Sequence, residues 1–522
     1  MRFSFTAVIV LAMVPFVALA QSPTLARSDY VYPGEDGKLV YVENERGDRL
    51  PDFSNCGYMG GGVALPEVPA QIVVEAGSAA RERIQAAIDM VAGLPPDESG
   101  FRGAVVLEPG RYMIDDTITI TAGGIVLRGS GNGEDGTVLV ATKRKQHTLI
   151  SVRGEGSWEE IEDTRHDITD EYVPVGARSF YVDSTEGLQV GDAVIVHRPS
   201  TKNWIHELGM DRIPPRKDGR KVHQWKPGSR DLHFDRIITA IDGTEVTIDA
   251  PVVNSLSQQY GGGSIYGYEY PGRIQNVGIE NLRCVSEFDD SKTARRHGQT
   301  YYSDEEHAWN CVHMQRVKNA WVGDVIAVHF GYSAVYVARR AKWITVQDCQ
   351  YIDPVSIITG SRRYSFALKG QLTLVQRCYT ENGRHDFVMH SVVSGPNAFL
   401  DCTARDAHSD SGPHHRWATG TLYDNVTVEG ALNVRNRGNS GTGHGWAGAQ
   451  MVFYNCTAET ITCQNPPTAL NWAIGCIVNN RRGHGEWDSS NNPVAPRSLY
   501  LAQLQERLGP GAVEAISPNA GQ

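Results

Sequence analysis

The most restrictive feature of this chain is a short strand pattern that repeats along its second half. Each repeat reads as a turn, a short apolar strand and a closing residue that is usually Cys. Seven segments show it: 276–284, 319–327, 342–349, 372–378, 397–402, 421–425 and 451–456. Short strands that recur at such intervals are typical of stacked β coils rather than of helical or leucine-rich repeats. The pattern therefore predicts a parallel β-helix in which the short intervals are single coils and the long ones carry loops.

The closing residues of the repeats predict a column inside the solenoid. Equivalent residues of successive coils stack about 4.8 Å apart, and a buried Cys behaves as a small apolar side chain. We expect a ladder of free thiols, with disulfides as the less favoured alternative for a chain that has nine Cys. One strand earlier, 332–337 aligns with 364–369, which supports the same stacking. The column comprises Cys284, Ala327, Cys349, Cys378, Cys402, Asn425 and Cys456.

The first part of the chain predicts the start of this solenoid. Residues 80–94 place Ile84, Ile88 and Val91 at helical spacing, as expected for an amphipathic helix that caps the open end. The stretches GAVVLEPGRY, TITIT and GIVLRGSG follow it. In these motifs the chain resembles the pectate-lyase-like superfamily of right-handed parallel β-helix proteins, and the resemblance continues to about residue 480. It implies the fold but selects no reaction, because that superfamily contains lyases, hydrolases, epimerases and phage adhesins.

The remaining segments complete the expected organisation. Residues 1–20 combine Arg2, an apolar run and a small-residue ending, which is the layout of a signal peptide, so we expect a secreted protein, either extracellular or periplasmic. An N-terminal extension (21–76) precedes the capping helix and first coils (77–177). A small antiparallel β insertion with an Asp242-Gly243 hairpin signal follows (178–255). The main coils with the active site (256–480) and a tail with a terminal helix (481–522) end the chain.

The charge and the apolar stretches of the chain indicate which kinds of partner it can bind. The net charge of −11 argues against a nucleic-acid partner. No stretch after the first twenty residues approaches the ~20 apolar residues of a membrane span, so we expect no membrane partner. An acidic polysaccharide or oligosaccharide is the expected partner, and we expect a monomer. Against this acidic background, residues 362–416 hold seven Lys or Arg and five His beside five acids. This local basic surface would attract a polyanion.

Register brings several titratable residues of this basic surface together. Counting from the Cys column places Arg384 beside His408 and Asp386 beside Asp410 on adjacent coils, while Lys369 falls beside His390. Single histidines in such coils are more often structural, but five within one short stretch favour chemistry. The expected catalytic residues are Lys369, Arg384, His385, His390, His408, His415 and Arg416.

A second segment, 433–446, reads as a glycine-rich loop that offers guanidinium groups and aromatic surface for a sugar. A plain surface loop between coils is the equally weighted alternative. Together with the basic surface, it completes the expected substrate-binding residues, which are Tyr364, His414, Arg435, Arg437, His444 and Trp446.

These residue types favour β-elimination at a uronic acid. Arg384 or Arg416 would neutralise the sugar carboxylate through a fork of N–H donors. His415 or Lys369 would act as base, and His408, His390 or Tyr364 as acid. The sequence thus predicts a secreted polysaccharide lyase.

Two other functions stay open at this point. A glycoside hydrolase would need two carboxylates about 5 to 9.5 Å apart, for which Asp386 and Asp410 are the best pair. A non-catalytic carbohydrate-binding protein would need no acid and base at all. The predicted lyase reaction requires no cofactor. The sequence does not determine whether a metal ion is bound, although Asp386, Asp406 and Asp410 could bind one Ca²⁺.

Overall fold

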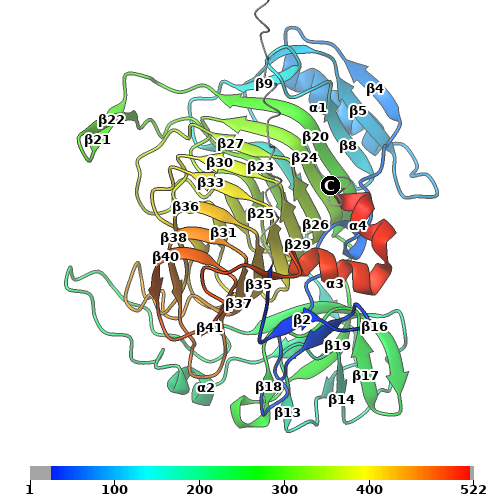
Figure 1. Cartoon of the computed structure of the whole chain (residues 1–522). Coiled ribbons are helices and arrows are strands. Elements are labelled where there is room, and N and C mark those ends of the chain that lie inside the picture. The colour runs from blue at the N-terminus through cyan, green and yellow to red at the C-terminus, as the bar shows by residue number, and fades with distance from the viewer. Residues whose placement is uncertain (1–24, 518–522) are drawn as a thin grey trace, which may run out of the picture.

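The computed structural model describes residues 25–517 and has the predicted fold, a right-handed parallel β-helix (Figure 1). The expected signal peptide lies outside the described residues. One continuous parallel sheet of 27 strands winds through the solenoid. Each complete coil gives one strand to each of three ladders, which we call A, B and C. The long strands β20 (Ile274–Ser286) and β24 (Val317–Val328) run through both ladder A and ladder B.

The strands of the ladders follow one another in register from coil to coil. Besides β20 and β24, ladder A contains β4 (Ala70–Val74), β5 (Gly103–Leu107), β8 (Ile125–Gly129), β26 (Lys342–Gln347), β29 (Gln371–Gln376), β32 (Asn397–Leu400), β35 (Ala418–Asp424), β37 (Gly448–Tyr454), β39 (Trp472–Ile474) and β41 (Glu486–Asp488). Ladder B contains β6 (Gly110–Ile114), β9 (Thr137–Ala141), β27 (Gln350–Ile352), β30 (Tyr379–Glu381), β33 (Thr403–Arg405), β36 (Thr427–Val434), β38 (Thr457–Cys463) and β40 (Ile477–Arg482). Ladder C contains β7 (Ile118–Ile120), β10 (His147–Arg153), β23 (Ala308–Gln315), β25 (Ser333–Val337), β28 (Phe366–Leu368), β31 (Phe387–Met389) and β34 (Asp410–Pro413).

The Cys column exists, but its register differs from the prediction at three places. Strand pairing puts Cys349, Cys378 and Cys402 at one level of successive coils. The next member is Val426 rather than Asn425, and Cys284 with Ala327 lies two residues beyond the column. All nine Cys are free and buried. The column is therefore an apolar thiol ladder, as expected, without disulfides.

Left-handed backbone explains the misplaced member. Asn425 has a φ of 52°, and Asp348, Asp401 and Asn455 have φ values of 55°, 52° and 51° at equivalent turns. Asn and Asp tolerate this conformation better than most residues. The turn bends the chain from ladder A to ladder B, so its Asn or Asp lies immediately before the buried residue and was mistaken for it. The alignment of 332–337 with 364–369 is also wrong by one residue. It pairs Val335 with Ala367, whereas in the structure Val335 pairs with Phe366.

The expected capping helix is present as α1 (Ala80–Ala92). Its residues Ile84, Ile88 and Val91 are fully or almost fully buried against the first coils and belong to the same core as the strands. The helix covers the end of the solenoid core, whose last layer would otherwise face water.

The insertion is larger than the predicted range 178–255. Its antiparallel sheet runs from β11 to β19. The chain leaves the coils after β10, which pairs with β7 and β23 of ladder C, and returns to them at β20. The predicted hairpin at Asp242-Gly243 is confirmed between β16 and β17. The insertion's elements are β11 (Glu159–Glu160), β12 (His166–Asp167), β13 (Tyr172–Val173), β14 (Ser179–Tyr181), β15 (Ala193–Arg198), α2 (Lys202–Glu207), β16 (Leu232–Asp242), β17 (Glu245–Ile248), β18 (Leu256–Ser257) and β19 (Ser264–Glu269).

The predicted terminal helix is present as α3 (Leu499–Leu508), followed by α4 (Pro510–Ile516). The two helices lie along the side of the solenoid, between the coils and the insertion (Figure 1). Leu499, Tyr500 and Leu504 pack on outward-facing residues of ladder A, together with Phe53 and Cys56 of the N-terminal extension. The N-terminal extension and the terminal helices thus cover an apolar outer face of the coils. No helix within residues 25–517 is long and apolar enough to cross a membrane.

Candidate functional site

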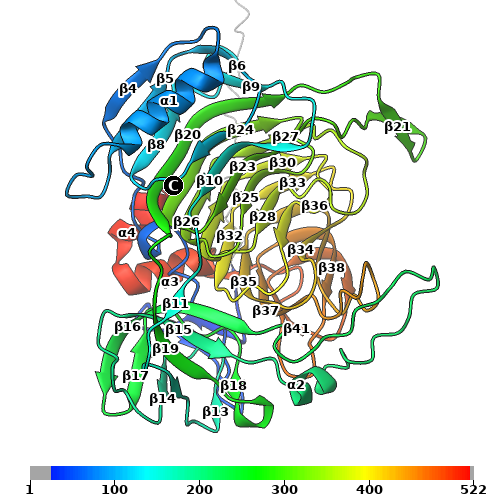
Figure 2. The ribbon, with the colours of Figure 1, turned by 180° about the vertical axis from the view of Figure 1, so that it is seen from behind.

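The candidate site lies on the outer face of ladder C, whose strands β10, β23, β25 and β28 lie side by side in Figure 2. Two columns of aromatic and imidazole rings run along this face from coil to coil. In the first column, consecutive ring centroids are 4.5 to 6.4 Å apart, and in the second they are 5.1 to 6.3 Å apart. The first column comprises Trp309, Tyr332, Tyr364, His385 and His414, and the second comprises His313, Tyr336, His390 and His415.

The columns meet at His444, whose ring lies 5.1 Å from the rings of both His414 and His415. We call the group of Tyr364, His385, His390, His414, His415 and His444 the imidazole site. His444 comes from the loop 433–446, which folds back over the coils instead of extending into solvent. Its backbone pairs with the insertion, since the His223 amide donates to the carbonyl of Thr442. The insertion therefore helps to position the site.

Hydrogen bonds fix the deeper rings. The hydroxyl of Tyr364 and Nε2 of His414 share a hydrogen bond of 3.1 Å, and Tyr332 shares one of 3.2 Å with Nε2 of His390. His385 is fully buried, and its Nδ1 lies 2.5 Å from the carbonyl oxygen of Asp410. A carbonyl can only accept, so Nδ1 carries the proton. In neutral His385 the lone pair therefore lies on Nε2.

Several buried nitrogens of the site have no partner within the described chain. They are His385 Nε2, the Nδ1 atoms of His414, His415 and His444, Arg384 Nη1 and Arg437 Nε. Buried polar atoms normally form hydrogen bonds, and unsatisfied ones are costly. Their concentration in one part of the coils indicates a place that can receive polar groups of a ligand.

The carboxylate that reaches these rings is Asp410, and it is already paired. Arg437 donates to it across 2.8 Å, and His385 Nδ1 lies 3.8 Å away. Burial alone would raise the pKa of Asp410, but the charge of Arg437 and a hydrogen bond from Ser409 help to hold it well below its usual range. Asp410 is thus a permanent anion that orients Arg437 and His385.

Burial keeps the imidazoles neutral. Burial, with smaller contributions from nearby positive charges, lowers the pKa of His385 and His444 to about 4, of His390 to about 3 and of His415 to about 2. Lys369, on the edge of the site, has a pKa lowered to about 8 by burial and by Arg339 and Arg416. At neutral pH the site therefore offers neutral rings beside cations of the Arg and Lys side chains.

A cationic groove continues from Lys369 along the coils. Two adjoining hollows of about 320 and 300 Å³ share Arg339, Arg340 and Lys369 in their walls. Tyr336 lines the first hollow, and Trp158 of the insertion, under the guanidinium of Arg340, lines the second. The groove combines positive charge with aromatic surface next to the imidazole site.

The structure brings most of the predicted residues together. Lys369 lies beside His390 because their strands pair in the predicted register, and Arg416 hydrogen-bonds to Thr442 in the loop 433–446. Arg384 lies near Tyr364 and His385, whose pKa values its charge lowers. Arg435 is solvent-exposed at the rim, within electrostatic reach of Asp410.

Two predicted site residues lie elsewhere. His408 does not join the imidazole site; its neighbours are Arg363, Arg296 and Asp406, at the turn that precedes ladder C. Its main-chain amide donates to the carbonyl of Gly383, which places it beside Arg384 as predicted, but its side chain lines the groove under the hairpin of residues 293–302 instead of the imidazole site. Trp446 is not a sugar platform, because it is only 8% exposed and packs with Trp225 and Trp417 in the core of the insertion.

The predicted carboxylate pair, Asp386 with Asp410, is wrong because the two side chains point in different directions. Asp386 points into the coil interior, where it accepts hydrogen bonds from Ser365 (2.7 Å) and Thr380 (3.0 Å). Asp410 faces the outside, and Asp406 is solvent-exposed. These three residues cannot form the calcium site considered above, and no group of three or more His, Cys, Asp or Glu within residues 25–517 is arranged to hold a metal ion.

Sequence reasoning missed the outer part of the ring columns and the groove. Tyr332 and Tyr336 served only to align strands, and His313 received no role. Alternation along β23 and β25 could have placed His313 and Tyr336 on the outer face, because they pair directly across ladder C. Trp158 had no such signal, since it reaches the groove from the insertion.

Comparisons with known proteins add no family. No family model matches the sequence, and no curated protein matches it. Among solved structures, the tailspike protein gp49 from Pseudomonas phage LKA1 is similar at 13% identity, with 78% of this chain and 70% of that chain covered and a TM-score of 0.35. DFA-IIIase from Arthrobacter chlorophenolicus A6 is similar at 11% identity, with 85% and 87% covered and a TM-score of 0.36. The catalytic domain of a GH87 alpha-1,3-glucanase is similar at 9% identity, with 83% and 67% covered and a TM-score of 0.34. These values are too low to transfer a function to this chain.

Proposed function

We propose that this protein is an exported polysaccharide lyase that cleaves a uronic-acid-containing chain by β-elimination at the imidazole site. The observation that carries the proposal is the charge of the site. Lys369, Arg384 and Arg416 surround neutral rings, and the carboxylate in contact with the rings, Asp410, is held by Arg437. Cations and unpaired imidazole nitrogens, next to the hollows lined by Lys369, suit an anionic sugar.

The elimination assigns a task to each group. Arg416 binds the sugar carboxylate and so stabilises the negative charge that develops when the C5 proton leaves. Lys369 in its neutral form takes that proton. The C4–O bond then breaks, a C4=C5 double bond forms, and the leaving oxygen takes a proton from the hydroxyl of Tyr364, which His414 orients. The electron pair of the C5–H bond becomes the double bond, so no other reactant is needed.

Hydrolysis is less well supported by this geometry. Both mechanisms of glycoside hydrolysis use two carboxyl groups on either side of the scissile bond. Asp386 faces the coil interior, and Asp410 is a paired anion without a proton to donate. The free cations of the site would also have no task in the hydrolysis of a neutral sugar.

Cleavage assays on a panel of acidic polysaccharides test the proposal. Pectate, rhamnogalacturonan, alginate, glucuronan and glycosaminoglycans are incubated with the protein, with and without a chelator. Ultraviolet absorbance of the unsaturated product is followed beside reducing ends. We expect both signals to rise together, and Lys369→Ala and Arg416→Ala to slow both by roughly 10²-fold or more. Arg482→Ala, an exposed cation on β40, is the matched control and should retain activity.

Two results would contradict this function. Reducing ends without absorbance would indicate hydrolysis, and an absorbance that rises as fast in Lys369→Ala as in the wild type would show that Lys369 is not the base. Export is tested separately by sequencing the N-terminus of the secreted protein, which we expect to begin near Gln21.

A further inference from the structure

A second groove lies under the hairpin formed by β21 (Thr293–Arg296) and β22 (Gln299–Tyr302), at the turns that bound ladder B. It consists of two adjoining hollows of about 800 and 680 Å³, which share Gln299, Asn382 and His408. The groove crosses several coils, because the second hollow also contacts the first residues of β36, β38 and β40. Neither the imidazole site nor the cationic groove shares any of these lining residues.

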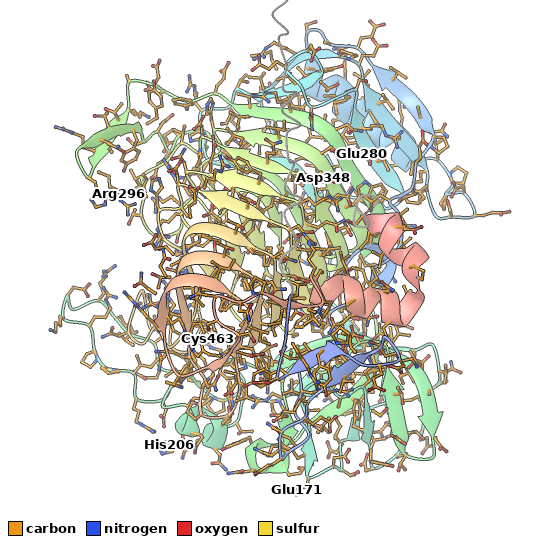
Figure 3. The ribbon with its side chains drawn as sticks, in the orientation of Figure 1. Glu171, His206, Glu280, Arg296, Asp348 and Cys463 are labelled. Atoms are coloured by element: carbon orange, nitrogen blue, oxygen red, sulfur yellow. The ribbon has the colours of Figure 1, made fainter. Side chains whose placement is uncertain are left out.

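The hairpin is held over the groove by specific contacts. An isolated two-stranded hairpin is at best marginally stable in water. Here the Ile358 amide donates to the hydroxyl of Tyr301 (3.3 Å), and the guanidinium of Arg363 lies 5.6 Å from that ring. Arg296, labelled on the projecting hairpin in Figure 3, donates to the carbonyls of Ile358 (3.4 Å) and His408 (3.5 Å). These contacts keep the groove open beneath the hairpin.

The hairpin end of the groove is aromatic. Tyr301 and Tyr302 line it, and Tyr302 stays 49% exposed although its ring lies 5.1 Å from that of Phe288. Exposed tyrosine rings with polar groups beside them are suited to sugars, whose apolar C–H faces pack on the rings while their hydroxyls form hydrogen bonds.

The other end of the groove is acidic. Asp406, Glu429 and Glu459 lie there on three successive coils, all solvent-exposed. Glu429 and Glu459 each follow a residue of the pair Val428–Ala458 on adjacent coils, at a bulge in the register of β36. Such a row of carboxylates repels a polyanion, but it can accept hydrogen bonds from sugar hydroxyls. This end of the groove therefore disfavours a polyanion, whereas Arg296 and Arg363 line the hairpin end, so the groove as a whole does not select an anionic chain.

We propose that the groove under the hairpin is a second saccharide-binding site, and that it takes an uncharged glycan chain. Sugar rings lie on Tyr301 and Tyr302, and hydroxyls further along donate to Glu429 and Glu459. This site would hold a neutral polysaccharide near the enzyme without cutting it. The inference does not depend on the proposed lyase activity, because it concerns binding at a different face of the coils.

Affinity electrophoresis tests this site. The protein is run in native gels that contain dextran, starch, β-1,3-glucan, galactomannan or xyloglucan, and in a gel with pectate. We expect at least one neutral polymer to retard the protein. Tyr302→Ala should weaken that binding about tenfold through loss of ring contact. Tyr181→Ala is the matched control, since Tyr181 is 50% exposed but lies on the insertion.

Two further variants separate this site from the imidazole site. Lys369→Ala should leave the retardation by the neutral polymer unchanged. Glu429→Lys combined with Glu459→Lys should weaken it and should increase retardation by pectate. The proposal is overturned if no neutral polymer retards the protein, or if Tyr302→Ala binds as well as Tyr181→Ala. Loss of lyase activity in the assays above would not affect either outcome.

Discussion

Lys369 decides how the proposed reaction responds to pH. Burial and two neighbouring guanidinium groups lower the pKa of its ammonium group to about 8. A base must be unprotonated to act, so kcat/KM should rise as the pH increases through about 8 and level off above it. Removing the base in Lys369→Ala should lower kcat by roughly 10²- to 10⁴-fold. Initial rates on the preferred acidic polysaccharide between pH 6 and 10 measure both effects.

The conservative variant gives the control for this residue. Lys369→Arg keeps the positive charge but cannot give up its proton near neutral pH. We expect it to bind substrate and to lack the rise near pH 8. If Lys369→Arg retains the wild-type pH profile, another group is the base, and neutral His415 is the next candidate.

At the scale of elements, the loop 433–446 depends on the insertion. Trp446 packs with Trp225, and the tip of the loop pairs with the insertion through Asn439, whose side chain donates to the carbonyl of Pro215. Trp446→Ala should lower the free energy of unfolding by about 3–5 kcal/mol, because it leaves a cavity in a packed core. It should also reduce kcat, because His444 lies two residues away on the same loop. Urea unfolding followed by fluorescence measures the first effect.

Trp446→Phe separates packing from sugar contact. It refills most of the cavity, so it should recover most of the stability and activity. A Trp446→Ala variant with normal stability and a raised KM would instead support the sugar platform predicted from the sequence.

At the scale of the whole molecule, buried imidazoles make the fold sensitive to acid. Histidines in an unfolded chain titrate near pH 6.5, whereas burial lowers the pKa of His385, His390, His415 and His444 to about 4 or below. The stability that these groups contribute is complete above pH 6.5 and is lost as the pH falls from there through their folded pKa values. In this pH window, each histidine that stays unprotonated only in the folded chain lowers the free energy of unfolding by about 1.4 kcal/mol per pH unit of acidification.

Two buried carboxyl groups act in the opposite direction. Burial raises the pKa of Asp386 to about 6 and of Asp424 to about 7, so their contribution to stability decreases as the pH rises from about 4 through those values. The histidines outnumber them, so the free energy of unfolding should fall between pH 6.5 and 5. Urea midpoints at several pH values measure it, and His390→Gln should make the fall less steep. Equal stability at pH 7 and pH 5 would show that these imidazoles are protonated in the folded protein.

The sequence by itself determined the solenoid, because a coil repeats the same local chemistry. Neighbours in the chain or in the stack account for the short apolar strands and for helix α1. They also account for the buried thiols of Cys349, Cys378 and Cys402. The same local register correctly placed Lys369 beside His390. Oligomeric state stays a prediction.

Only the tertiary structure decided which way the site residues point and what surrounds them. Asp386 and Asp410 are adjacent in register, yet one side chain turns inward and the other outward, because the bend before ladder C breaks the strict alternation of a strand. His408 turns away at the same bend. The insertion, distant in sequence, buries Trp446 and brings Trp158 to the cationic groove. Periodicity predicts what repeats from coil to coil, whereas turns and insertions occur once, and their contacts depend on the folded chain.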